Sequence, residues 1–312
     1  MNTFNKIYKA TRLWIILIIA LLFPQIVTKN STLYLACLSL MYAILTVSLN
    51  ILSGFSGLMS VGHIAFFGLG AYTTAILTTT YHWPIALGFL CAGLVSTLAF
   101  GIIVYQMFKN LKSLTNGTKG ILKIPVIEIF GVSFKPYKMY YYLMLLGLIF
   151  SVIVAYNLLH SRPGRAILAI RESDIAAEAM GINVVTYKLV AFMTSAFIAG
   201  IAGALYAHMM RYISPEPFAQ AESNALLSMM VVGGIGSIPG AILGGIALTI
   251  LPEVLRFIGD FRLVIYGAAV VAIVIFAPQG LGGLVEHIDR VLCGKEPWKV
   301  KRVETGREEA ES

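Results

Sequence analysis

Seven charged side chains of this chain lie close together in a segment whose other residues are mostly small and apolar. Residues 160–188 read HSRPGRAILAIRESDIAAEAMGINVVTYK and lie between two long apolar runs. Arg165 and Arg171 alternate with small apolar residues at helical spacing, and Asp174 and Glu178 repeat the pattern four residues apart. Such a surface can insert its apolar side into a groove of another protein and hold it through charges at the rim. The alternative is a solvated loop whose arginines only fix the orientation of the chain in a membrane.

We expect this segment to be helical around 164–180. Pro163 suits the first turn, and Gly181 suits the residue that ends the helix, where a positive φ is needed. Arg171 and Glu172 are expected to pair with charges on the partner, and Ala177 to fit closely against it. The residues proposed for the docking contact are Arg165, Arg171, Glu172, Asp174, Ala177, Glu178 and Gly181.

A second unusual segment is rich in glycine, serine and histidine. It reads SGFSGLMSVGHIAFFGLGAY from Ser53, and VGGIGSIPG (232–240) is a second run of this kind. Glycine at this density weakens a continuous helix, and transporters build substrate sites from such interrupted segments. Tight packing between helices is the alternative. The candidate pathway residues are Asn50, Gly54, Ser56, Gly57, Ser60, Gly62, His63, Gly233 and Gly234.

The residue patterns of the common enzyme classes are absent from the sequence. It has no H-E-x-x-H motif and no G-x-x-x-x-G-K-[ST] phosphate loop; LTNGTKGILK has the wrong spacing. Its three cysteines have no spacing typical of disulfides or metal sites. We therefore predict no catalytic residue, no metal site and no cofactor bound by this chain. If ATP drives the protein, another subunit must bind it.

The composition indicates a membrane protein. The chain is 58% hydrophobic and 12% charged, about half the charge of a soluble domain. A spanning helix needs about 20 mostly apolar residues. The sequence predicts an all-α, polytopic helical membrane protein with about 8 spans plus re-entrant or broken helices. Residues 1–288 form the membrane-spanning domain and 289–312 a polar cytoplasmic tail. The expected spans are 13–27, 33–52, about 61–79, 84–108, 139–159, 189–210, 241–255 and 263–277.

Basic residues make conflicting demands on the topology. Segment 109–138 contains six lysines, and segment 160–188 contains four basic residues. Basic loops are preferentially cytoplasmic, so the rule predicts a cytoplasmic location for both segments. Only the run 139–159 separates them, so they lie on opposite sides of the membrane. We expect 160–188 inside and 109–138 outside. Counting spans from a cytoplasmic N-terminus gives the reverse, so one run does not cross or one crossing is missing.

The order of motifs resembles that of branched-chain amino-acid ABC transporter permeases of the LivM type. The resemblance is strongest in GRAILAIRESDIAAEAMGINVVTYKLVAFMTSAFIAGIAGALYAH, which begins at Gly164. It continues in LNILSGFSGLMSVGHIAFFGLGAYTTAIL (49–77) and VVGGIGSIPGAILGGI (231–246). Shorter matches are SPEPF (214–218), LPEVLR (251–256) and FAPQGLGGL (276–284).

The resemblance implies a permease subunit of an ATP-driven importer in the bacterial inner membrane. The implied substrate is a branched-chain amino acid, with urea or another amide or amino acid as alternatives. The implied partners are cytoplasmic ATPase subunits, a second homologous permease subunit and an external substrate-binding protein, with no nucleic acid. Segment 164–181 is then the coupling helix that receives the movement of the ATPase.

The chain departs from the family pattern at one place, where it lacks the membrane-spanning segment that would put 160–188 in the cytoplasm. In the family, the run ending near Tyr105 is followed by another crossing segment before a loop resembling LTNGTKGILKIP (114–125). Here the two are joined directly. Either the chain is a shortened form, or 53–79 is re-entrant.

Two other function classes remain open. An ion-coupled secondary transporter needs intramembrane carboxylates, which are nearly absent; none precedes Glu128. A membrane-embedded enzyme lacks a recognisable catalytic set.

Overall fold

A computed structural model describes residues 17–27, 29–96, 120–129, 132–133, 136–277 and 280–283. The predicted tail 289–312 and the direct joint after Tyr105 lie outside these residues. So do residues 109–119, the first part of the six-lysine segment 109–138.

All eight predicted apolar runs contain helix, which confirms the all-α, polytopic class. Four helical stretches are long and apolar enough to cross a membrane: Asn30–Phe55, Tyr137–His160, Val184–Met210 and Ile238–Gly259. Four others are shorter: Leu17–Ile26, Ile64–Thr79, Ile85–Ser96 and Val264–Phe276. By length and composition, half of the predicted spans therefore qualify among the described residues.

The helices carry the following bounds. The first half contains α2 (Asn30–Leu49), a π-helical continuation η1 (Asn50–Phe55), α3 (Ile64–Thr79) and α4 (Ile85–Ser96). The middle contains α7 (Tyr137–His160), α8 (Arg162–Glu172), α9 (Asp174–Ala179) and α10 (Val184–Met210). The last part contains η3 (Glu216–Phe218), α11 (Gln220–Gly233), α12 (Ile238–Val254), η4 (Leu255–Phe261) and α13 (Arg262–Phe276).

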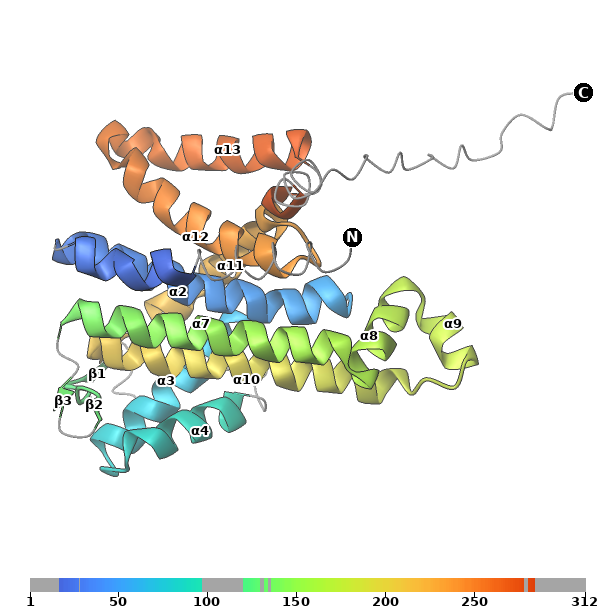
Figure 1. Ribbon diagram of the computed structural model, residues 1–312, viewed down its shortest axis with the longest axis horizontal. Coiled ribbons are helices and arrows are strands. Elements are labelled where there is room, and N and C mark those ends of the chain that lie inside the picture. The colour runs from blue at the N-terminus through green and yellow to red at the C-terminus, as the bar shows by residue number, and fades with distance from the viewer. Residues whose placement is uncertain are drawn as a thin grey trace, which may run out of the picture.

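Three long helices, α2, α7 and α10, pack against one another and run along the length of the molecule (Figure 1). On one side, α3 and α4 form a hairpin that packs on α10. On another, α11 and α12 pack together and both contact α2. Nearly all buried apolar side chains of these helices belong to one continuous core.

Glycines allow the closest helix crossings. A Cβ at Gly70 of α3 would overlap the backbone of Gly200 in α10, and one at Gly244 of α12 would overlap Met229 of α11. A Cβ at Gly240 would likewise overlap the backbone of Gly233. Gly200, Gly240 and Gly244 are therefore packing positions between helices, which is the role that small residues at such spacings commonly have.

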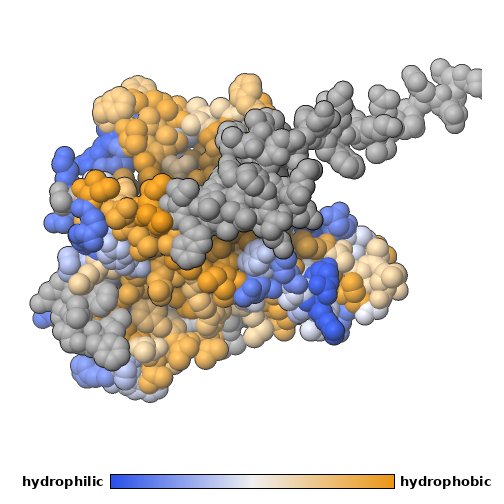
Figure 2. All heavy atoms as spheres, in the orientation of Figure 1, coloured by the Kyte–Doolittle hydropathy of each residue, from blue (hydrophilic) through white to orange (hydrophobic). Residues whose placement is uncertain are grey.

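The two ends of the long helices carry different structures. At one end, two short antiparallel pairs form: β1 (Ile121–Leu122) with β4 (Tyr212–Ile213), and β2 (Glu128–Ile129) with β3 (Val132–Ser133). At the other end, α8 and α9 extend beyond the bundle (Figure 1). Figure 2 shows hydrophobic residues over the body and hydrophilic ones toward both ends. The segment before α7 and the segment after it thus lie at opposite ends, as predicted.

Candidate translocation pathway and coupling loop

Residues 160–188, called here the coupling loop, fold as two short helices and not as the single helix expected around 164–180. Ser161 caps α8 by accepting a hydrogen bond from the Gly164 N–H at 3.2 Å. Ser173 is extended (φ −163°, ψ 116°), and its hydroxyl accepts from the Ala176 N–H at 3.2 Å. The continuous-helix prediction is wrong at Ser173 because serine serves equally well as the N-cap of a new helix.

The end of α9 has the geometry that the sequence predicts. Gly181 has φ +80°, and its N–H donates to the Glu178 carbonyl at 2.9 Å. The N–H of Ile182 donates to the Ala177 carbonyl at 3.0 Å. This pair of bonds is a Schellman motif, which requires a left-handed residue at the position of Gly181.

The coupling loop has a small core of its own. Ile170, Ala177 and Val184 pack together with exposed fractions of 2%, 4% and 7%. We expected Ala177 to fit closely against a partner, but the break at Ser173 turns α9 so that this side chain faces inward. The outward apolar residues are instead Ile175 and Met180, each 83% exposed. The expectations from sequence missed both of them, because Ile175 and Met180 are five residues apart and residues on one helical face are three or four apart.

The charged residues assigned to docking lie on the surface of the loop. Arg165, Glu172, Asp174 and Glu178 are all exposed. Asp174 forms an ion pair with Lys188 within the loop. The coupling loop therefore presents exposed apolar side chains, Ile175 and Met180 the most exposed among them, together with charges of both signs.

The two glycine-rich interruptions, which we treated separately, meet in the structure. The helix changes from α to π at Asn50, and α11 ends at Gly233. The Asn50 side chain is fully buried; its carbonyl oxygen accepts from the Gly236 N–H at 2.8 Å. Its amide donates to the Ser237 carbonyl at 3.0 Å. One asparagine thus bonds the loop between α11 and α12 to the break in α2.

Arg171 of the coupling loop contacts this junction. A Cβ at Gly236 (φ +81°) would lie 2.8 Å from the Arg171 Nη1, and one at Gly57 would lie 3.8 Å from its Cγ. Only at Gly236 would a side chain compete with the arginine for space. The exposed Arg171 side chain therefore lies beside both interruptions from the end of α8, a position that its expected role in pairing with a partner did not include.

His63 forms a hydrogen bond within the bundle. Its Nε2 lies 2.8 Å from the Ser48 hydroxyl, and the Ser48 hydroxyl donates to the Ser195 carbonyl at 2.7 Å. The Ser195 hydroxyl in turn donates to the Ser48 carbonyl at 2.6 Å. This fully buried cluster ties α2 and α10 to the start of α3.

Exposure divides the nine candidate pathway residues into two groups. Six are buried, and they form the interior of the junction or the histidine cluster: Asn50, Gly54, Ser56, His63, Gly233 and Gly234. Three are exposed or half-buried: Gly57, Ser60 and Gly62. These three belong to one non-helical run, 57–62, which is the accessible part of the predicted set.

An unpredicted helix, α11, lies beside this run. The Gln220 side-chain amide donates to the Val61 carbonyl at 2.7 Å, and the Ser223 hydroxyl accepts from the Ile64 N–H at 3.3 Å. We did not predict this helix because its polar residues kept it below the apolar threshold for a span. Its polar side chains at positions 220, 224 and 228 carry the period that marks one helical face.

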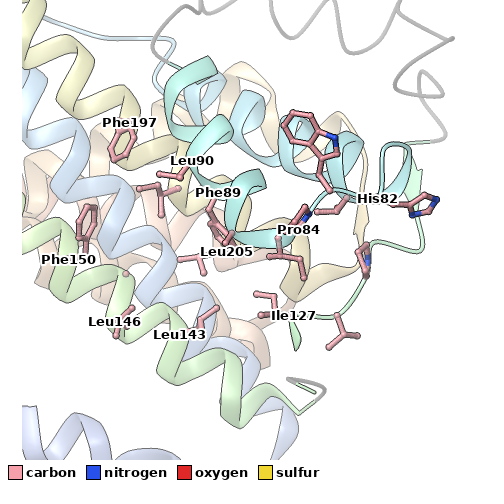
Figure 3. A pocket seen from close by; sticks show the side chains of 18 residues that line it. His82, Pro84, Phe89, Leu90, Ile127, Leu143, Leu146, Phe150, Phe197 and Leu205 are labelled. Atoms are coloured by element: carbon pink, nitrogen blue, oxygen red, sulfur yellow. The ribbon is translucent and has the colours of Figure 1, made fainter. Parts of the chain in front are cut away.

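A cavity of about 1120 Å³ lies elsewhere, between α4, α7 and α10. Phe89, Leu143, Leu146 and Phe150 are among the side chains that point toward it (Figure 3). None of the residues assigned to the pathway or the coupling loop lines it. Its walls are largely apolar, so it is unsuited to a polar solute.

Comparison with known proteins gives a consistent set of relatives. Residues 93–277 match the family described as "Branched-chain amino acid transport system / permease component". The chain is 33% identical over 311 residues to the high-affinity branched-chain amino acid transport system permease protein LivM of Escherichia coli K12, covering 85% of this chain and 73% of that protein. It is 24% identical over 285 residues to BraD of Pseudomonas aeruginosa, a permease protein of the same description, covering 78% and 92%. No solved structure matches.

These alignments also contain residues that this chain lacks. The alignment to LivM is 311 residues long but includes 85% of 312 residues here, about 265, which leaves about 45 positions without a counterpart. The alignment to BraD is 285 residues long and includes 78% of the 312 residues here, which leaves about 40 positions without a counterpart. One spanning helix needs about 20 residues. The difference is large enough to include the missing crossing that the sequence suggested.

Proposed function

This chain belongs to the family of permease components of branched-chain amino acid transport systems, and we propose how it works within such an importer. It is an integral, multi-pass membrane subunit. The finer proposals are that a separate cytoplasmic subunit hydrolyses ATP, that the coupling loop receives the resulting movement, and that the run 57–62 forms part of the pathway wall. The proposed location is the bacterial inner membrane.

The coupling loop has the surface that docking to an ATPase requires. Ile175 and Met180 project from it, and exposed Arg165, Glu172 and Glu178 lie in the same two short helices. Burial of two such apolar side chains stabilises a complex by roughly 1.5–3 kcal/mol each. The charges then select the partner and its orientation.

The route from the loop to the pathway is short. Arg171 sits at the end of α8, and its side chain lies within 4 Å of the positions that a Cβ would take at Gly57 and at Gly236. Both glycines belong to the interruptions, and Gly57 begins the exposed run 57–62. A shift of α8 therefore acts directly on the segment that we assign to the pathway wall. This contact is the observation on which the proposed coupling rests.

A second homologous permease subunit is the proposed partner within the membrane. Part of this chain, 41% of its length, is 32% identical to the permease protein LivH of Escherichia coli K12, which carries the same system name as LivM. The two relatives bear names of one transport system and resemble this chain, so a pair of related subunits is the arrangement we propose. An external substrate-binding protein would dock at the opposite end from the coupling loop.

Reconstitution tests the proposal. The chain would be co-expressed with the ATPase and permease subunits encoded beside it, purified, and placed in liposomes with the binding protein. We expect radiolabelled leucine uptake that requires ATP and is lost when the ATPase is inactivated by mutation. Uptake of urea but not leucine would change the substrate. Uptake driven by a proton or sodium gradient without ATP would contradict the importer mechanism.

A further inference from the structure

We infer that one face of α11, formed by Gln220, Asn224 and Ser228, lines the translocation pathway and contacts the charged ends of the amino acid. This inference rests on the proposed function and assigns to it residues that the sequence motifs did not single out. Gln220 and Asn224 are exposed and Ser228 is half-buried. The spacing of four residues places all three on the same face.

The first observation is the polarity of this face within an apolar bundle. Leu226, Met229 and Met230, on the other side of α11, are almost fully buried in the core. A side-chain amide that faced lipid would lose its hydrogen bonds to water, at a cost of a few kcal/mol. Since Asn224 is exposed, its surroundings must be water or another polar surface. A pathway for a polar solute provides such surroundings.

The second observation is the neighbour of this face. The Gln220 amide bonds to the Val61 carbonyl, so α11 lies along the non-helical run 57–62. That run is held in shape by Ser53, whose hydroxyl donates to the Leu58 carbonyl at 2.9 Å and accepts from the Ser60 N–H at 3.4 Å. Two accessible polar elements, one of side chains and one of backbone, therefore lie next to each other.

The chemistry of these groups matches a zwitterion. A side-chain amide donates to a carboxylate through its NH₂ and accepts from an ammonium through its oxygen. Neither group carries a full charge, so a bound amino acid is not held so tightly that it cannot leave. Conduction requires this balance between entry and release. The face therefore suits transient contact with an α-amino acid.

The same face becomes apolar toward the coupling loop. After Ser228 it continues with Val231, which is half-buried, and then with Ile235 in the following loop, which is 51% exposed. Ile235 directly precedes Gly236, where Arg171 makes its contact. Polar contacts thus end, and apolar ones begin, next to the residue that links the pathway to the coupling loop. An apolar constriction at this position would close the pathway to water.

Cysteine accessibility tests the position of the face. Single cysteines would replace Asn224 and Ser228 in a chain whose Cys37, Cys91 and Cys293 are changed to alanine. The controls are Leu146→Cys on α7 and Val271→Cys on α13, both exposed apolar positions. A charged methanethiosulfonate reagent requires water at the thiol. In the assembled transporter, we expect reaction at 224 and 228 at least about tenfold faster than at 146 and 271, and slowed by leucine and its binding protein.

The opposing result is equally clear. If the cysteines at 224 and 228 are as unreactive as the controls while the transporter remains active, the face is a dry contact with the second permease subunit. Reaction at 224 and 228 that leucine does not slow would place water there but no substrate contact. Either result would overturn the inference and leave the proposed function intact.

Substitution of Asn224 tests the contact itself. Loss of one hydrogen bond to a charged group commonly costs about 1.5 kcal/mol, which is about tenfold in affinity. We expect Asn224→Leu to raise the KM for leucine about tenfold with unchanged ATPase association, and Asn224→Gln to restore most of the activity. Wild-type KM in Asn224→Leu would overturn the inference. Failure of the unmutated complex to transport leucine would instead overturn the proposed function.

Discussion

Asn50 shows how much one side chain contributes to the organisation of this molecule. It joins a break in the second helix to a loop 187 residues further along the chain, through one donated and one accepted hydrogen bond. The Gly236 N–H lies in the loop between α11 and α12 and has no helical partner, so the asparagine supplies its acceptor. The Ser237 carbonyl also accepts from the Ala241 N–H of α12. The glycines around it provide the space: a Cβ at Gly54 would collide with the Asn50 side chain.

We predict that Asn50→Ala destabilises the protein by about 1–3 kcal/mol, since the Gly236 N–H would lose its acceptor and the Ser237 carbonyl one of its two donors. Thermal unfolding of the purified chain in detergent measures the effect. Asn224→Ala is the matched control: it removes the same side chain from an exposed position and should leave the unfolding temperature unchanged. Equal unfolding temperatures for Asn50→Ala and the unmutated chain would show that the junction does not depend on the asparagine.

At the scale of helices, the accuracy of sequence-based prediction followed the strength of the local signal. The eight apolar runs contain helix because hydrophobicity and length alone identify them. The first turn of α8 and the stop at Gly181 were predictable because caps are local. The helix α11 was missed because its polar face, now its most informative feature, lowers its average hydrophobicity.

What could not be predicted depends on contacts between distant segments. The break at Ser173 is local, but serine is compatible with either a helix interior or an N-cap. In the structure Ser173 is an N-cap, and Ala177 packs against Ile170 and Val184. The meeting of the two glycine-rich runs, and the position of Arg171 between them, cannot be deduced from their order along the chain. The burial of six of the nine candidate pathway residues could not be predicted either, because it also depends on which distant segments meet.

The C-terminal end of α9 offers a test of backbone conformation without a steric clash. A Cβ at Gly181 would meet nothing within 4 Å, so only the positive φ constrains the residue. We predict that Gly181→Asn keeps transport near the unmutated rate because asparagine adopts the left-handed region readily. Gly181→Val should abolish most ATPase binding because the β-branched side chain disfavours that conformation. Pull-down of the ATPase and leucine uptake measure both. Similar behaviour of the two variants would mean that the helix stop has no part in docking.

Arg171 tests whether the coupling loop acts on the pathway or only holds the ATPase. We predict that Arg171→Ala leaves the ATPase bound and active but lowers leucine uptake per ATP hydrolysed by about tenfold, because the contact with Gly57 and Gly236 is lost. Arg162→Ala, at an exposed arginine of the same helix that is not among the proposed docking residues, is the control and should not change this ratio. Arg171→Lys keeps the stem and charge and should restore part of the coupling. If Arg171→Ala simply releases the ATPase, the arginine acts at the docking surface instead.

At the scale of the whole molecule, function depends on which end faces the cytoplasm. The long helix α7 connects the strand-bearing end to the coupling loop, so the two ends lie on opposite sides of any membrane that α7 crosses (Figure 1). The four basic residues of the coupling loop favour the cytoplasm, but the six lysines of 109–138 favour it as well. Charge alone therefore does not decide the orientation. The docking surface proposed on α8 and α9 favours the cytoplasm for that end, because an ATPase is available only inside the cell.

We predict that an impermeant maleimide labels Leu122→Cys in intact spheroplasts and labels Ser173→Cys only after the membrane is permeabilised. Both positions are exposed, Leu122 at 62% in β1 and Ser173 between α8 and α9, so accessibility to water does not differ between them. The native Cys37, Cys91 and Cys293 would be replaced beforehand. The reverse labelling would place the coupling loop outside, where no ATPase can dock, and would remove the basis of the coupling mechanism. Labelling of both cysteines in intact spheroplasts would mean that α7 does not cross, because a single crossing separates the two positions.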